Sequence, residues 1–234
     1  MRITSLNRYK VASAMVRGFF NGYFFGQTDA RMPGRKTIEP REYKQILADN
    51  YNTLSAHFVS VIFPVLIRLN FSDGEAVAAD MQKRKFSNST SPKILLRYAC
   101  GTKALYDAVV ADYQRQMGSL LNGKLQPIAD FFTEYDRGSE DAEEVSVDLA
   151  IRSVVRVQML AYATGIKAAN TEVQSLYQGT VYKLMIHGMM ALMHEEPVSL
   201  EGDNLEMIFR RVSLNSENFE TLMNEMNQAY EDLA

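Results

Sequence analysis

Apolar residues recur at three- and four-residue steps along most of the chain, which is the spacing of one face of an α-helix. The clearest run begins after Pro40, and its apolar members are Tyr43, Ile46, Leu47, Leu54, Phe58, Val61, Val65 and Leu69. This run predicts a helix of about thirty residues that bends at Pro64, because a proline inside a helix removes one backbone hydrogen bond.

Capping and stop residues divide the rest of the chain into further helices. The stretches expected to be helical are 72–86, 91 onward, 102–122, a short one from 127, 141–163, 171–195, 204–212 and 216–233. The caps expected at two of the starts are Ser72 with Glu75 and Thr102, and Ser91 with Pro92 marks the start of a third helix. Within 145–151, VSVDLAI also alternates as a strand does. The pattern predicts an all-α fold with about eight to ten helices in a single domain over residues 1–234.

Residues 18–26, GFFNGYFFG, place a glycine at every fourth position among aromatic residues. Glycine inside a helix costs about 0.5–1 kcal/mol relative to alanine, so three glycines on one face need a compensating close contact. We favour a core helix packed closely on another. The alternative is an interface with another chain. Its candidate residues here are Gly18, Phe19, Gly22, Tyr23 and Gly26. A further alternative is a break of the helix at Gly26, since 27–34 has the composition of a loop.

The composition is that of an ordinary globular chain, with 234 residues, 47% hydrophobic and 23% charged. The single cysteine excludes an intrachain disulfide framework. No apolar run reaches the length of a membrane-spanning helix, so we expect a soluble protein without a span. The apolar run before Arg17 is too short for an export signal. Residues 1–28 contain basic residues and no acid, which leaves open a role as an organellar targeting segment. The expected location is the cytoplasm or the interior of a virion.

The two halves of the chain carry opposite charge. Residues 1–103 contain 16 Lys and Arg and 7 Asp and Glu, whereas residues 104–234 contain 9 and 21. This asymmetry indicates either an acidic partner for the basic half or neutralisation of one half by the other, within a chain or head to tail between copies.

A cluster of cations without any acid lies between Asp80 and Asp107. Its members are Lys83, Arg84, Lys85, Lys93, Arg97 and Lys103. Such a cluster can contact phosphates, with Phe86 and Tyr98 placed in the sequence to stack on bases. It lacks the residues of a named nucleic-acid motif, and a solvated basic helix face explains it equally well.

No motif specifies a reaction. Residues 118–124 have the glycine and lysine spacing of a P-loop, but Leu125 replaces the hydroxyl residue and the preceding pattern is helical. His187, Met190 and His194 share a helical face that suits copper, although core or interface packing is favoured for them. Cys100 lies at a predicted helix C-terminus, where the dipole opposes a thiolate. We expect no cofactor or metal.

These features favour a non-enzymatic assembly or adaptor subunit, such as a viral or phage structural component, that binds a protein partner or itself. A second group of candidate interface residues is Met189, Met190 and Met193. The first alternative is a nucleocapsid-like protein that binds nucleic acid through residues 83–103. The second alternative is a helical enzyme or metal-binding protein that uses the 187–194 face.

Overall fold

The computed structural model describes residues 5–31, 40–121 and 144–169. These residues form six helices and two short strands: β1 (Ser5–Asn7), α1 (Arg8–Arg31), α2 (Pro40–Asn70), α3 (Gly74–Lys83), α4 (Pro92–Cys100), α5 (Lys103–Leu121), β2 (Glu144–Ser146) and α7 (Val147–Ala168). The predicted all-α class is confirmed. The helices expected from 127 and within 171–233 lie outside the described residues, so the total of eight to ten stays a prediction.

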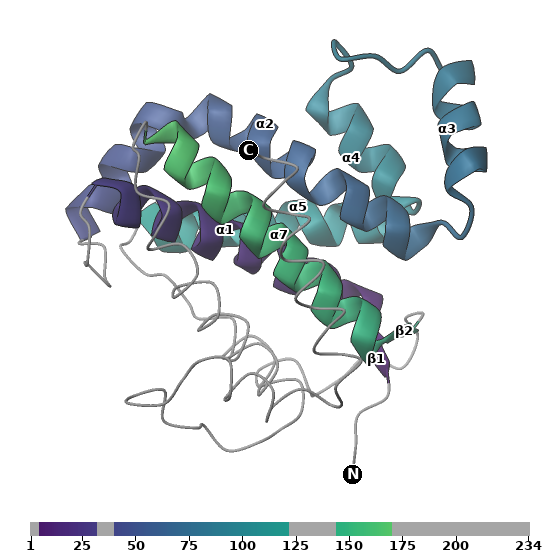
Figure 1. Cartoon of the computed structure of the whole chain (residues 1–234), viewed down its shortest axis with the longest axis horizontal. Helices are drawn as coiled ribbons and strands as arrows, with labels where there is room; N and C mark the ends of the chain where they lie inside the picture. The colour runs from purple at the N-terminus through teal and green to yellow at the C-terminus, as the bar shows by residue number, and fades with distance from the viewer. Residues whose placement is uncertain (1–4, 32–39, 122–143, 170–234) are drawn as a thin grey trace.

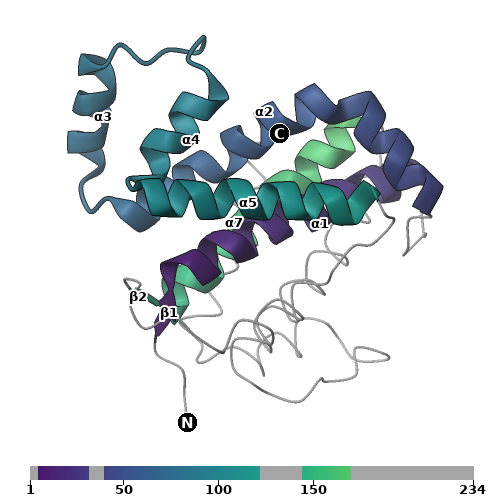
Figure 2. The same cartoon turned by 180° about the vertical axis from the view of Figure 1, so that it is seen from behind.

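Helix α1 is the centre of the helical body. Helix α7 follows it on one side and α5 on the opposite side, while α2 packs against all three (Figure 1 and Figure 2). Nearly every α1 residue from Val11 to Thr28 is buried. The buried residues include the polar Arg17, Asn21, Gln27 and Thr28, so α1 is enclosed by its neighbours on all sides.

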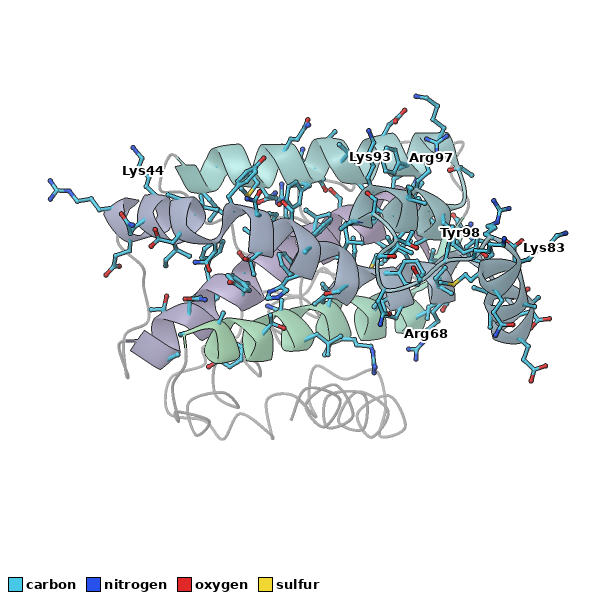
Figure 3. The ribbon with its side chains drawn as sticks, turned by 90° about the horizontal axis from the view of Figure 1, so that it is seen from above. Lys44, Arg68, Lys83, Lys93, Arg97 and Tyr98 are labelled. Carbon is cyan, nitrogen blue, oxygen red and sulfur yellow. The ribbon has the colours of Figure 1, made fainter. Side chains whose placement is uncertain are left out.

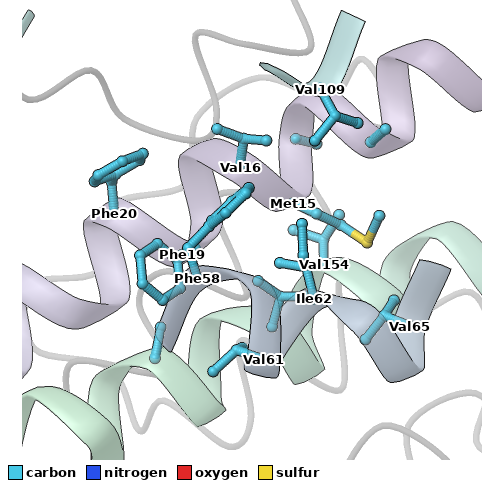
Figure 4. Packing of buried hydrophobic residues seen from close by; sticks show 14 of the residues in the cluster. Met15, Val16, Phe19, Phe20, Phe58, Val61, Ile62, Val65, Val109 and Val154 are labelled. Atoms are coloured by element: carbon cyan, nitrogen blue, oxygen red, sulfur yellow. The ribbon is translucent and has the colours of Figure 1, made fainter. Parts of the chain in front are cut away.

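Aromatic side chains link α1 to α2 and α5 in the core. The ring centroid of Phe58 on α2 lies 5.2 Å from that of Phe19 and 4.7 Å from that of Tyr113. The Tyr113 hydroxyl shares a hydrogen bond of 2.7 Å with Ser55, which satisfies its polar end. Figure 4 shows the surrounding apolar side chains, which include Met15, Val16, Phe20, Val61, Ile62, Val65, Val109 and Val154.

Helices α1 and α7 run in the same direction and approach closely at two glycines. A Cβ atom at Gly22 would collide with the carbonyl oxygen of Gln158 and stand 3.1 Å from the backbone nitrogen of Tyr162. A Cβ atom at Gly165 would likewise collide with the carbonyl oxygen of Tyr23. Both obstacles are backbone atoms, so the separation of the two helices depends on the missing side chains.

A two-stranded ribbon precedes this helix pair. Strands β1 and β2 are antiparallel, and the buried residues Leu6 and Val145 face each other across them. Each strand ends in a cap for the helix that follows. The Asn7 Oδ1 atom accepts a bond from the Tyr9 amide at 2.8 Å, and the Ser146 Oγ atom accepts one from the Leu149 amide at 3.3 Å.

The ribbon corrects the predicted start of the last described helix. That helix was expected from about residue 141, but 144–146 are a strand and α7 begins at Val147. The reason is long-range: residues 144–146 pair with 5–7, and no local signal in the sequence announces that pairing. Of the stretch 145–151 that alternates as a strand does, only residues 145 and 146 are in a strand, and the rest belong to α7.

The helix boundaries of α1 and α3 also differ from the prediction. Helix α1 continues through the buried Gly26 to Arg31, so the alternative of a break at Gly26 is wrong. Helix α3 is capped by Asp73 instead of Ser72, because the Asp73 Oδ1 atom accepts bonds from the amides of Glu75 and Ala76 at 2.9 and 3.0 Å. The predicted continuity of α2 through Pro64 is confirmed.

Helix α2 contains a stretch, Lys44–Asn70, that is long and apolar enough to cross a membrane by length and composition. In the structure, 44% of its most apolar window is buried, and Leu54, Phe58 and Ile62 belong to the core. The core helix of a soluble protein meets the same criterion. The expectation that the chain has no membrane span therefore stays a prediction.

Candidate functional site

Between α2 and α5 the chain leaves the helical body as an arm, residues 71–102, that consists of α3, the connecting loop and α4 (Figure 1). Helix α4 packs against α2 and α5. Helix α3 lies at the outside, and Val77 is its one buried residue. Most residues of α3 are thus exposed, whereas α4 is packed against the body.

The six cations of the predicted basic cluster all lie on or next to this arm, and all six are exposed. Lys83, Arg84 and Lys85 lie where α3 ends, and Lys93 lies where α4 begins. The end of α3 and the start of α4 form the same end of the arm, which we call the arm tip, residues 83–93 (Figure 1). Arg97 follows Lys93 by one turn of α4 (Figure 3), and Lys103 begins α5.

The tip has a defined backbone shape. Lys85 adopts a left-handed conformation with a φ of 57°, which turns the chain away from α3 at a cost of about 1–2 kcal/mol. Hydroxyl groups then order the loop. The Ser87 amide donates to Thr90 Oγ1 at 2.8 Å, and the Thr90 amide donates to the Ser87 carbonyl at 2.9 Å. The lysines of the tip are therefore attached to an ordered turn.

Tyr98 of α4 is the centre of the arm's own core. Its ring stacks on Phe71 at 5.7 Å and meets the edge of Phe86 at 5.3 Å. The Arg84 guanidinium lies 5.5 Å from the same ring and forms an ion pair of 2.8 Å with Asp80. Phe86 and Tyr98 therefore contact each other within the arm, and the stacking on bases considered from the sequence would have to displace these contacts.

Ionisation reinforces the Asp80–Arg84 pair. The pKa of Asp80 is lowered, first by its hydrogen bond with Arg84 and then by a hydrogen bond from Tyr98. The pKa of Tyr98 is raised, chiefly by desolvation and next by the same bond to Asp80. Asp80 is thus ionised and Tyr98 protonated at neutral pH, which is the state in which these bonds form.

The remaining cations divide into two groups. Arg97 lies over the ring of Tyr106 at 5.3 Å, and Lys103 forms an ion pair with Asp107 on α5. By contrast, Lys83, Lys85 and Lys93 make no ion pair with any residue that the structure describes. The cluster therefore contains three cations with internal contacts and three exposed lysines without an ion pair, of which Lys83 still lowers the pKa of Asp80 slightly by its charge.

The other candidates from the sequence lie elsewhere. Every residue proposed in 18–26 as an interface, namely Gly18, Phe19, Gly22, Tyr23 and Gly26, is buried inside the chain on α1. The candidates outside the described residues are His187, Met189, Met190, Met193, His194 and residues 122–124 of the P-loop-like stretch. Cys100 is buried, and burial raises the pKa of its thiol to about 12, which excludes a reactive thiolate at neutral pH.

Buried polar groups at the α1–α7 contact were not anticipated from the sequence. Gln27 donates to the Tyr23 hydroxyl at 3.3 Å, whereas the Nε2 atom of Gln158 has no partner among the described residues. Half-buried His57 has a lowered pKa because of desolvation. Within 5–31, 40–121 and 144–169, no group of three His, Cys, Asp or Glu residues is arranged to hold a metal ion.

No family model, curated protein sequence or solved structure matches the chain. The chemistry of the arm is accordingly the basis for a functional proposal.

Proposed function

We propose that the protein is a non-enzymatic assembly or adaptor subunit that binds through its arm, in the first instance to other copies of itself. The observation that supports this proposal is the exposure of six cations on or next to the arm, whose outer helix α3 has Val77 as its one buried residue. The cytoplasm or a virion interior would suit such a subunit.

Charge provides the physical reason for self-association. The basic arm belongs to a chain whose residues 104–234 carry 21 Asp and Glu against 9 Lys and Arg. Opposite charge on two surfaces accelerates encounter and selects the orientation of docking. Each copy would thus supply both a basic arm and acidic surface for another copy.

The test is absolute mass by light scattering at about 0.02 M and about 0.5 M salt, since the Debye length falls severalfold over this range. We expect a discrete oligomer or growing polymer at low salt that dissociates at high salt. An oligomer indifferent to salt would indicate an apolar interface instead. A mass of 26.5 kDa at both salt concentrations would contradict self-assembly.

Nucleic-acid binding is the second candidate function, and the absence of any acid from the sequence between Asp80 and Asp107 favours it. Contacts would go to phosphates, because Phe86 and Tyr98 are engaged with each other. We expect the protein to bind a DNA or RNA duplex with an affinity that falls steeply as the salt concentration rises. Unchanged binding after Lys83, Arg84 and Lys85 are all replaced by Glu would rule out this use of the arm.

A further inference from the structure

We infer that the contact surface of the proposed assembly is the set of three lysines at the arm tip, Lys83, Lys85 and Lys93, and that it binds the acid-rich residues 170–234 of a second copy. This inference rests on the proposed function and adds the contact residues and the occupant to it.

The first step concerns which cations are available. Arg84 is held by Asp80 and lies over Tyr98, Arg97 lies over Tyr106, and Lys103 is paired with Asp107. A partner would have to displace these contacts to use those three cations. Lys83, Lys85 and Lys93 are exposed and make no ion pair with a described residue, so their ammonium groups can bind a partner without such a loss.

The second step concerns the chemistry of the partner. Arginine recognises phosphate and carboxylate by a planar pair of donors, whereas a lysine ammonium is a point charge on a flexible stem. The tip therefore offers charge without a fixed geometry. Sequence-tolerant binding of single-stranded nucleic acid usually adds aromatic stacking, and the rings of Phe86 and Tyr98 are already packed together. Scattered carboxylates suit this surface better.

The third step concerns the occupant. Residues 170–234 contain 11 Asp and Glu and only 3 Lys and Arg. Because both segments belong to the same chain, every copy carries one basic arm and one acidic stretch. The basic tip of another copy would be attracted to this excess of acid. A contact between two different surfaces of identical chains is head to tail, which produces rings or open filaments.

The first experiment compares assembly of the full-length protein with that of two charge-reversal variants. The test variant carries Lys83→Glu and Lys85→Glu. The control carries Arg41→Glu and Lys44→Glu, which changes the net charge equally; both positions are exposed, and Lys44 lies at the opposite end of the molecule from Lys83 (Figure 3). Circular dichroism and thermal melting confirm that each variant is folded.

We expect the test variant to need about tenfold or more protein than wild type for half-assembly at low salt, and the control to behave as wild type. Equal assembly of wild type and the test variant would overturn the inference and leave the proposed function in place. A wild-type protein that stays monomeric would contradict self-assembly itself, and the inference would fail with it.

The second experiment identifies the occupant. An equal mixture of unlabelled and ¹⁵N-labelled protein is treated with a carbodiimide, which joins a lysine amine directly to a carboxylate it touches. We expect mixed-isotope peptides that link Lys83, Lys85 or Lys93 to carboxylates within 170–234. Links only within single chains, or only to other carboxylates, would overturn the inference. So would wild-type protein that yields no such links but binds a DNA duplex that the test variant does not bind.

Discussion

At the scale of single residues, two glycines set the distance between the helices that share the largest contact in the described structure. Gly22 of α1 faces the backbone of Gln158 and Tyr162, and Gly165 of α7 faces the backbone of Tyr23. A flexible side chain can move aside for an added methyl group, but a helix backbone moves only with its whole element. These two positions therefore tolerate no side chain without a shift of α7.

We expect Gly22→Ala and Gly165→Ala each to lower the free energy of unfolding by about 1–3 kcal/mol, the usual cost of overpacking. The control is Gly118→Ala on α5, where a Cβ atom would meet nothing within 4 Å. There the substitution should raise the free energy of unfolding by about 0.5–1 kcal/mol, because alanine is the better helix former. Urea denaturation measures all three values.

The sign of the difference is the decisive result. If the substitutions at 22 and 165 stabilise the protein as much as the one at 118, then α1 and α7 are not in close contact in solution.

At the scale of elements, the arm is held together by a small core of its own around Tyr98. Phe71 directly follows α2 and Phe86 lies in the loop after α3, so one ring on α4 joins three segments of the arm. The core of the body contributes little to α3, whose one buried residue is Val77. Helix α3, the outer part of the arm, should therefore be able to loosen while the body stays folded.

We expect Tyr98→Ala to accelerate amide hydrogen exchange in α3 by tenfold or more, while α1 and α7 keep their protection. The matched variant Tyr98→Phe retains the ring and loses only the hydrogen bond to Asp80. Its effect on exchange should be much smaller, because that bond lies near the surface. Exchange that accelerates equally in α1 and in α3 would show that α3 is not a separate unit of stability.

At the scale of the whole molecule, segments far apart in the sequence complete one body. Strand β2 pairs with β1, and the Ser5 hydroxyl donates to Glu144 at 2.5 Å across 139 residues of chain. Helix α7 covers one side of the central helix α1 (Figure 1). Without α7, the glycine and aromatic residues of α1 that pack against it would be exposed to solvent. This dependence supports the prediction of a single domain.

We expect fragments 1–121 and 122–234 to fail to fold separately and to copurify when they are expressed together. The reason is that the first contains α1 without α7 and the second contains α7 without α1. Affinity purification through a tag on one fragment, followed by thermal melting, measures this. A cooperative melting transition of 1–121 alone would contradict a single domain and indicate two.

The sequence by itself determined the features that depend on neighbours within about four residues. The helical period and Pro40 predicted α2, Ser91 with Pro92 predicted the start of α4, and the Thr102 cap of α5 is confirmed by its bond to the Leu105 amide at 3.2 Å. It also located the basic cluster, because consecutive charges without acids are visible in any chain.

Tertiary structure alone decided the features that depend on distant partners. Three-residue strands carry too short a pattern to be recognised, so only the pairing of 5–7 with 144–146 defines them. Gly26 would end an isolated helix, yet burial among neighbouring helices keeps α1 continuous. The division of the cations into internally held and solvent-exposed groups likewise required Asp80, Tyr98, Tyr106 and Asp107 in three dimensions. Local chemistry sets which elements form, and contacts between elements set which of their side chains remain available.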